Sequence, residues 1–173
     1  MSVSSAKLQS TLCQGAVYFA PTRDTNSPDC HFCVVVSEDP KSERLVLYEI
    51  VSSKVEKTKR RVELQGHYAS SAVELGKPEV GFLPLPSVVD CNVCKEVSLS
   101  TFEQDLKMPQ AYYAGRLPPG ILKRIVHESL VSKGVKPDSK RKINKVRALA
   151  LEKKAEDLKN GVMPSPEIKI TVN

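Results

Sequence analysis

Two apolar runs separated by a short turn constrain the fold of this chain more than any other feature. The first run, His31–Val36, is continuous and β-branched, which suits a strand buried on both faces, and the second run spans 44–51. The turn-forming sequence at 38–42 is too short for a crossover, so the two runs predict an antiparallel hairpin. Further strand candidates predict a small barrel or curled sheet, and they lie at 15–20, 88–91 and 95–99.

The pattern changes from strand to helix near residue 117. Pro118 and Pro119 suit the start of a helix, and apolar residues recur at helical spacing from 121 to 130. A second helix is predicted over about 140–160, and a short strand-like tail at 168–172. The apolar stripe of the second helix is predicted at Ile143, Val146, Leu149, Ala150 and Leu158.

These patterns together predict an α+β fold in three parts. A polar N-terminal tail is expected at 1–12, an antiparallel β-barrel at 13–116, and a basic helical extension at 117–173. The length is enough for a hydrophobic core that needs no disulfide or metal to fold.

The net charge of +6 is concentrated in the helical part. Residues 1–122 carry 13 Lys and Arg against 14 Asp and Glu, whereas residues 123–159 carry 12 against 5. A basic segment favours polyanions as partners. The sequence contains neither the apolar run of a signal peptide nor a stretch able to span a membrane, so we expect a cytoplasmic protein with reduced cysteines and no membrane partner.

Several short motifs follow one another in a recognisable order. A Gly-initiated strand and a loop precede His-x-x-Val-Val-Val-Ser, a hairpin, and a strand that ends in Val-Ser-Ser. A Gly-His break, a Ser-Val-Val-Asp strand and a helix introduced by Gly-x-Leu come after them. This order, from about Gly15 to Ser132, resembles the PemK/MazF-like group, best known as endoribonuclease toxins of toxin–antitoxin systems. The resemblance implies a small SH3-like antiparallel β-barrel, followed here by the basic C-terminal helical extension.

The resemblance also implies where a catalytic site would lie. In the toxins, an Arg at the base of the Val-Val-Val-type strand and a Thr at the end of the next strand help to cut single-stranded RNA through its own 2′-hydroxyl. The matching positions here are His31 and either Ser52 or Ser53. The reaction needs a base, an acid and a cation, but no metal or other cofactor. His31 suits acid or base chemistry near neutral pH, whereas a His is a poorer permanent cation than an Arg.

Other basic residues are therefore candidates to replace the missing cation or to contact RNA. These candidates are Arg23, Lys59, Arg60, Arg61 and His67. The other interpretation of the basic triplet at 59–61 is a solvated strand end, and that of His67 is a plain surface histidine. For His31 the alternative is a structural histidine in the core or at a strand edge.

Two Cys-x-x-Cys pairs raise the alternative of a structural zinc site. Cys30 with Cys33 and Cys91 with Cys94 have the ligand spacing of tetrahedral zinc. Both pairs lie at or inside predicted strands, where residues i and i+3 point to opposite faces. Buried, apolar cysteines without metal are the other interpretation, and we assign no metal ligand.

The basic helix offers a surface for the phosphate backbone of RNA. Its candidate contacts are Lys140, Arg141, Lys142, Lys145 and Arg147. Such contacts position nucleic acid without reading its sequence. The alternatives are a solvated amphipathic helix and a docking site for an acidic partner.

Two functions from different classes follow from these observations. The first is a PemK/MazF-like protein that cleaves or binds single-stranded RNA, with an acidic antitoxin-like inhibitor and a homodimer among its expected assemblies. The second is a catalytically inactive barrel that binds protein or nucleic acid, with its two Cys-x-x-Cys pairs as a zinc staple. The loss of the strand Arg is what a non-enzymatic descendant of the toxins would show.

Overall fold

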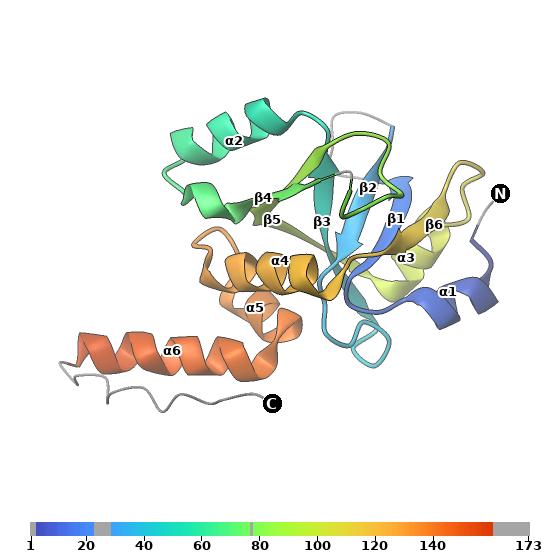
Figure 1. Cartoon of the computed structure of the whole chain (residues 1–173). Helices are drawn as coiled ribbons and strands as arrows, with labels where there is room; N and C mark the ends of the chain where they lie inside the picture. The colour runs from blue at the N-terminus through green and yellow to red at the C-terminus, as the bar shows by residue number, and fades with distance from the viewer. Residues whose placement is uncertain (1–2, 23–28, 77, 161–173) are drawn as a thin grey trace.

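A single curled sheet forms the centre of the molecule (Figure 1). The computed structural model describes residues 3–22, 29–76 and 78–160. Neighbouring strands pair antiparallel in the order β4-β5-β3-β2-β1-β6, and β4 and β6 are the two edges of a half-barrel. The strands are β1 (Ala16–Pro21), β2 (Cys30–Val35), β3 (Leu45–Ser52), β4 (Ala72–Leu75), β5 (Ser87–Ser98) and β6 (Tyr112–Arg116). The predicted α+β fold with a small antiparallel barrel-like sheet is therefore confirmed.

The predicted hairpin is present as β2 and β3. Phe32 pairs with Val51 and Val35 pairs with Tyr48, so the two strands run side by side over their length. Val34 and Val35 are both fully buried although they point to opposite faces. Both faces of this part of the sheet are covered, which is the reason for its continuous apolar run.

Three features of the sheet differ from the sequence-based expectation. The segments predicted as separate strands at 88–91 and 95–99 form one long strand, β5, which continues through a bulge at 90–93. The edge strands β4 and β6 were not predicted. Both are short, and β6 contains Gly115, whose φ of 158° lies at the limit of the glycine-favouring region.

One face of the sheet is covered by helices α1 (Ser5–Thr11) and α3 (Leu99–Asp105). Leu8 and Phe102 pack with Tyr18 and Tyr48 in one hydrophobic cluster. Within the predicted polar N-terminal tail, Ser5–Thr11 forms a helix, because Ser4 caps it and Leu8 anchors it in the core.

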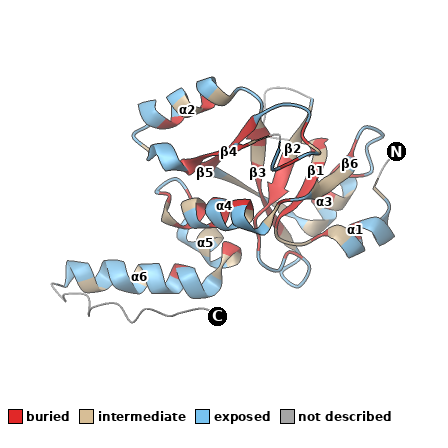
Figure 2. Ribbon diagram, in the orientation of Figure 1, coloured by how far each residue is buried: buried red, intermediate tan, exposed pale blue. Residues whose placement is uncertain are grey.

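The other face is covered by helix α4 (Pro119–Val131), as the helical spacing predicts. Its apolar residues Ile121, Ile125 and Leu130 share one cluster with Val34 and Leu47 of the sheet. Figure 2 shows the buried stripe of α4 turned toward the strands.

The second basic helix is broken into two. Helix α5 (Pro137–Ile143) ends at Asn144, whose side chain accepts a hydrogen bond from the Arg147 backbone and begins helix α6 (Lys145–Lys159). The predicted single helix and its apolar stripe are therefore wrong. Ile143 is fully buried, whereas Val146, Leu149 and Leu158 are exposed. Of α6, Ala148 alone is buried in the core, and the rest of the helix extends away from the sheet (Figure 2).

The basic triplet lies on a helix and not at a strand end. Helix α2 (Val55–Leu64) follows β3 and packs through Val62 against Ala72 and Val88, and the short 3₁₀ turn η1 (Ala69–Ser71) leads on to β4. No helix within the described ranges is long and apolar enough to cross a membrane. The predicted tail strand at 168–172 lies outside the described residues.

Candidate active site

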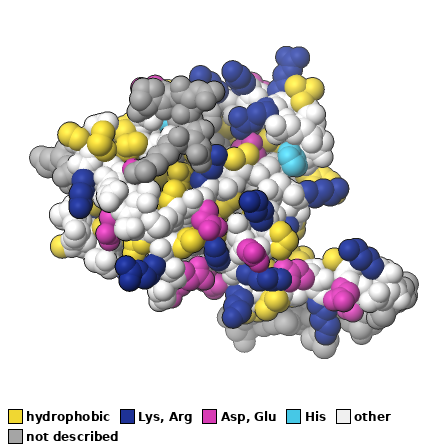
Figure 3. Space-filling model, turned by 180° about the vertical axis from the view of Figure 1, so that it is seen from behind, with side chains coloured by type: hydrophobic (Ala, Val, Ile, Leu, Met, Phe, Trp, Pro, Cys, Tyr) yellow, Lys and Arg dark blue, Asp and Glu magenta, His cyan; other side chains and the backbone are white. Residues whose placement is uncertain are grey.

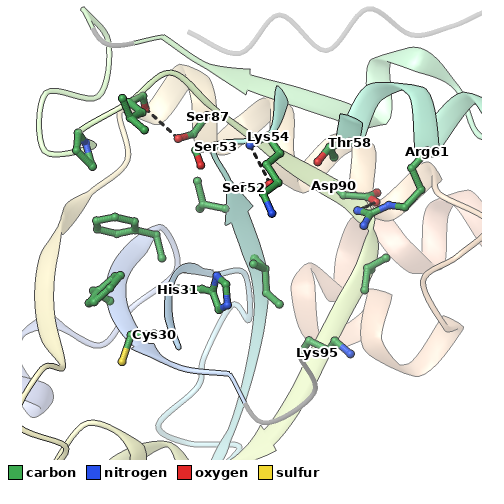
Figure 4. A pocket seen from close by; sticks show the side chains of 17 residues that line it. Cys30, His31, Ser52, Ser53, Lys54, Thr58, Arg61, Ser87, Asp90 and Lys95 are labelled. Carbon is green, nitrogen blue, oxygen red and sulfur yellow. Dashed lines mark hydrogen bonds and ion pairs between the residues drawn. The ribbon is translucent and has the colours of Figure 1, made fainter. Parts of the chain in front are cut away.

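A bulge between β3 and β5 opens a cavity at the end of the sheet. From Glu49 to Val51, β3 advances by two residues, while its partner β5 advances by five, from Cys94 back to Val89. Extra residues on one strand bend it and redirect its side chains. Asp90 and Val93 of the bulge line a cavity of about 520 Å³, together with residues of β2, β3 and α2 (Figure 4).

His31 and Ser52 lie on the neighbouring strands β2 and β3, at the wall of this cavity. Phe32 pairs with Val51, so one step further along each strand His31 comes opposite Ser52. Both residues line the cavity, as does Ser53, and Figure 4 shows the His31 ring below Ser52.

The polar atoms of these two residues differ in their surroundings. Nε2 of His31 is buried and has no hydrogen-bond partner among the described residues. Ser52 Oγ accepts a hydrogen bond from the backbone N–H of Lys54 at 3.1 Å. Because that bond uses a lone pair of the oxygen, the Ser52 proton remains free to be donated to a ligand.

Three cations line the same cavity: Lys54 and Arg61 from the α2 region, and Lys95 from β5. Arg61 forms an ion pair with Asp90 at 2.8 Å, and Asp90 is almost fully buried while Arg61 is half-exposed. Because Asp90 is the one carboxylate among the residues that line the cavity, the lining carries more positive than negative charge. Such a site favours an anionic ligand.

A buried polar network holds the bulge in place. Asn92 Nδ2 donates to Asp90 Oδ1 at 2.9 Å and to Ser71 Oγ at 2.7 Å, and Ser132 Oγ donates to Asn92 Oδ1 at 2.7 Å. Gly134 lies against this segment, where an added Cβ would come within 2.5 Å of the Asn92 carbonyl oxygen. The network fixes Asp90, and through it Arg61, at the wall of the cavity.

The structure separates the other predicted residues of the barrel from this cavity. Lys59 pairs with Glu74 and Glu56 on the surface of α2, and Arg60 on the same helix is exposed. His67 lies at a separate small depression beside α4. Of the basic triplet, Arg61 alone lines the cavity. Arg23 lies outside the described residues.

The predicted contacts of the basic extension also lie apart from the cavity. Lys142 pairs with Glu96 at 3.1 Å, and Arg141 pairs with Glu152 at 3.1 Å. Arg147 Nη2 lies 3.1 Å from His127 Nδ1. Lys140 and Lys145 are the remaining members of this set, and the Lys145 backbone N–H donates to Glu38. Along α6, basic and acidic side chains are interspersed (Figure 3).

The four cysteines of the Cys-x-x-Cys pairs do not converge. Cys33 lies in the cluster with Tyr18, on the opposite face of the sheet from Cys91 and Cys94. The residues that the structure describes contain no group of His, Cys, Asp and Glu able to hold a metal ion. Burial raises the pKa of the Cys33 thiol to about 12, so it is a neutral, apolar core residue.

The sequence-based analysis missed Lys54, Asp90, Asn92 and Lys95. Asp90 and Asn92 carry a signal that could have revealed them, because two polar residues interrupt the apolar run Val-Val-Asp-Cys-Asn-Val of a buried strand. Lys54 and Lys95 carry no such signal, since their place at the cavity depends on how α2 and β5 pack.

Comparison with known proteins identifies the fold. No protein-family model matches the sequence, and no curated protein sequence matches it significantly. The crystal structure of MazE-MazF (Form-III) from Deinococcus radiodurans matches with a TM-score of 0.50 and 13% identity, over 73% of this chain and 99% of the matched chain.

Two structures from Mycobacterial species match over similar lengths. One is an endoribonuclease in complex with its cognate antitoxin, with a TM-score of 0.46, 12% identity and coverage of 73% of this chain and 96% of that chain. The other is an endoribonuclease with a TM-score of 0.48, 13% identity and coverage of 72% and 93%. The Deinococcus radiodurans match carries the conclusion: this chain has the PemK/MazF-like fold, as the order of its motifs predicts.

Proposed function

We propose that this protein cleaves single-stranded RNA without a metal ion, with the 2′-hydroxyl of the substrate as nucleophile. The observation that carries the proposal is that His31 and Ser52, from the neighbouring strands β2 and β3, line one cavity together with three cations. The fold adds support, because the matched structures include proteins described as endoribonucleases. The cavity volume of about 520 Å³ is within the range of small-ligand sites and suits one nucleotide unit.

In this mechanism His31 exchanges the proton of the nucleophile. The imidazole of His31, which lines the cavity, accepts the proton of the 2′-hydroxyl as that oxygen attacks the adjacent phosphorus. The bond from phosphorus to the 5′-oxygen breaks, and the leaving oxygen takes a proton, which leaves a cyclic phosphate and a free 5′-hydroxyl. The ammonium groups of Lys54 and Lys95 are the candidate donors for the leaving oxygen.

Ser52 and the cations stabilise the phosphate as negative charge gathers on it. The Ser52 hydroxyl donates to a phosphate oxygen, since its own oxygen already accepts from the Lys54 backbone. Arg61 contributes a permanent charge, held in orientation by Asp90. The charge that the toxins place on the strand of His31 is thus supplied here from α2 and β5.

The test is RNA cleavage by the pure protein with site variants. His31→Ala should lower the cleavage rate by about 100-fold or more, because general acid–base catalysis contributes that much. Ser52→Ala should lower it by about 100-fold, because it removes one donor to the phosphate. Replacing the 2′-hydroxyl by hydrogen at every position of the RNA should abolish cleavage. His127→Ala, at an exposed histidine of α4, is the matched control and should cleave normally. Normal cleavage by both the His31→Ala and the Ser52→Ala variant would show that these residues do not form the catalytic site.

A second function, a catalytically inactive binding module, is favoured by one observation. Strand β2 carries His31 where the toxins carry Arg, so the strand itself supplies no permanent cation. A binding module of this kind would bind RNA but would not cleave it under any condition. The protein–protein alternative is an acidic, antitoxin-like partner, and one matched structure is described as an endoribonuclease in complex with its cognate antitoxin. Sedimentation of the purified protein tests the homodimer that we also propose.

The proposed RNA contacts of the basic extension have weaker support than the cavity. Lys142 and Arg141 are engaged by Glu96 and Glu152, so a phosphate would have to compete with these carboxylates. The exposed lysines of α6, Lys153 and Lys154, are the better candidates for backbone contacts. Their contribution would be sequence-independent and sensitive to salt.

A further inference from the structure

Three aromatic side chains form a cluster at the edge of the cavity that the proposed chemistry does not use. Phe19 of β1 lies between Phe32 of β2 and Tyr112 of β6, because it pairs with both across the sheet. The ring centroids of Phe19 lie 5.0 Å from Phe32 and 5.3 Å from Tyr112, and those of Phe32 and Tyr112 are 6.2 Å apart. These distances are typical of stacked and edge-to-face contacts.

This cluster differs from the aromatic residues of the core. Tyr18, Tyr48 and Phe102 are almost fully buried, whereas Phe19 and Phe32 are half-buried and Tyr112 is 44% exposed. Phe19 and Phe32 line the same cavity as His31. The cavity therefore has an aromatic wall beside its cationic wall, and part of the aromatic surface is open to solvent.

The two walls together indicate the chemistry of the ligand. A ligand that is only anionic would make no stacking contact with the aromatic rings. An apolar peptide would leave the charges of Lys54, Arg61 and Lys95 without a partner. An unpaired nucleotide suits both walls, because its base has a flat aromatic face and its phosphate is anionic. Asp90 is paired with Arg61, so the lining presents no unpaired carboxylate to repel the phosphate.

We propose that the cluster of Phe19, Phe32 and Tyr112 stacks an unpaired RNA base while the cations of the cavity hold its phosphate. The inference rests on the proposed function in one respect, the choice of single-stranded RNA as ligand, and it is independent of whether RNA is cut. Tyr112 is the ring that contacts the base, because it is the most exposed of the three. Phe19 and Phe32 support it from the strand interior.

Stacking by a flat ring predicts tolerance of base identity. Every base has a π-face, so the cluster would bind any unpaired base and would discriminate against duplexes, in which both faces are already stacked. The cluster would thus supply preference for single strands, while sequence preference would have to come from other contacts.

The test measures binding of an RNA that cannot be cut. Fluorescence anisotropy would report the affinity of a 2′-O-methyl single-stranded oligonucleotide for the full chain and for Tyr112→Ala, with an abasic 2′-O-methyl strand of the same length as second ligand. Tyr112→Ala should weaken binding of the base-bearing strand by about tenfold, as expected for loss of one stacked base. Binding of the abasic strand should change by less than about twofold, because no base is present to stack.

Two control variants make the outcome specific. Tyr112→Phe keeps the ring and should bind like the wild type, and Tyr68→Ala removes an exposed tyrosine elsewhere on the surface and should have no effect. Equal weakening for both strands, or no weakening for the base-bearing strand, would overturn the proposal. So would a Tyr112→Ala variant that changes the sedimenting mass of the protein without changing RNA affinity, since the cluster would then be a contact between two copies.

The same measurements separate this inference from the proposed cleavage. If natural RNA is not cut but Tyr112→Ala selectively weakens the base-bearing strand, the stacking site stands and the catalytic proposal fails. If RNA is cut with unchanged affinity in Tyr112→Ala, the catalytic proposal stands and the stacking site fails.

Discussion

Cations gather in two regions of this molecule, and they are arranged differently in each. Around the cavity, Lys54 and Arg61 from the α2 region and Lys95 from β5 line one space together with His31. In the C-terminal arm, defined here as α5 and α6, the cations point to solvent or pair with carboxylates, as Lys142 does with Glu96. Along the sequence, positive charge is most dense in the arm. In the folded protein, the cations that line one common site are those of the cavity.

The difference shows that charge density in a sequence does not by itself locate a site. Exposed, interspersed charges give a weak and screened potential, whereas charges that face one cavity with apolar walls act together on a single ligand. Lys142 attaches the arm to the body of the protein. Its ammonium group forms an ion pair with Glu96, and its backbone carbonyl accepts a hydrogen bond from the Glu38 N–H at 2.8 Å. The following predictions test whether the arm is a docked part of the body or a free basic tail.

The largest expected effect is on stability, at the point where the arm is anchored. Ile143 is fully buried in the core cluster that contains α4 and the sheet, so Ile143→Ala should lower the free energy of unfolding by about 2–5 kcal/mol. Urea denaturation followed by circular dichroism measures this change. The same truncation at Val146, which is 78% exposed, should change stability by less than about 0.5 kcal/mol. Equal effects at the two positions would mean that the arm is not docked.

A second prediction concerns Glu49, which joins the sheet to the helical half. Its Oε1 lies 2.6 Å from the Ser129 hydroxyl of α4, and that hydroxyl also lies 2.7 Å from the Ile125 carbonyl oxygen. One hydroxyl proton cannot be donated to both acceptors, so a protonated Glu49 completes the pair. Complete burial raises the pKa of Glu49 from 4.5 to about 8, with the nearby charge of Asp90 acting in the same direction.

The raised pKa fixes the sign of the pH dependence. Between pH 4.5 and about 8 the folded protein holds a proton on Glu49 that the unfolded chain has lost, so this group makes stability fall as pH rises. The slope is about 1.4 kcal/mol per pH unit. Glu49→Gln keeps the shape and can donate to Ser129, so it should remove this slope and be the more stable protein at pH 7, by about 3 kcal/mol at most. A variant with the same pH profile as the wild type in thermal unfolding would refute the buried proton.

Much of the fold could be predicted from the sequence because its signals are local. The apolar run from His31 to Val36 and the turn after it specify a hairpin without reference to the rest of the chain. The same holds for the spacing of Ile121, Ile125 and Leu130 in α4. Local signals failed where tertiary packing determines the secondary structure. Val55–Leu64 is a helix whose Val62 packs on β4 and β5. The helical arm is interrupted at Asn144, next to Ile143, which is buried in the core.

The candidate site was predictable only in part for the same reason. His31 and Ser52 were indicated by the resemblance of their motifs to those of the toxins, and both line the cavity. Lys54 and Lys95 reach the cavity through the docking of α2 and through the bulge in β5, and no short sequence pattern records either event. The bulge depends on Asn92 bonding to Ser71 and Ser132, residues that are distant in sequence.

The smallest expected effect compares the two cationic regions directly. Lys54→Gln with Lys95→Gln removes two charges from the cavity, and Lys153→Gln with Lys154→Gln removes two from the arm, so each double variant lowers the formal charge of +6 by the same amount. Anisotropy with an uncleavable single-stranded RNA over a range of salt concentrations gives the slope of log affinity against log salt. Each lost phosphate contact should reduce that slope by about 0.7 for a single strand.

We expect the cavity variant to reduce the slope by about 1.4 and the arm variant to reduce it by less. The reason is that the cavity lysines share one enclosed anion site, whereas the arm lysines are exposed among Glu152, Glu156 and Asp157. The opposite result, with the larger change in the arm variant, would show that nucleic-acid affinity lies in the arm. The cavity would then keep the candidate chemistry of His31 and Ser52 but would not be the main phosphate-binding region.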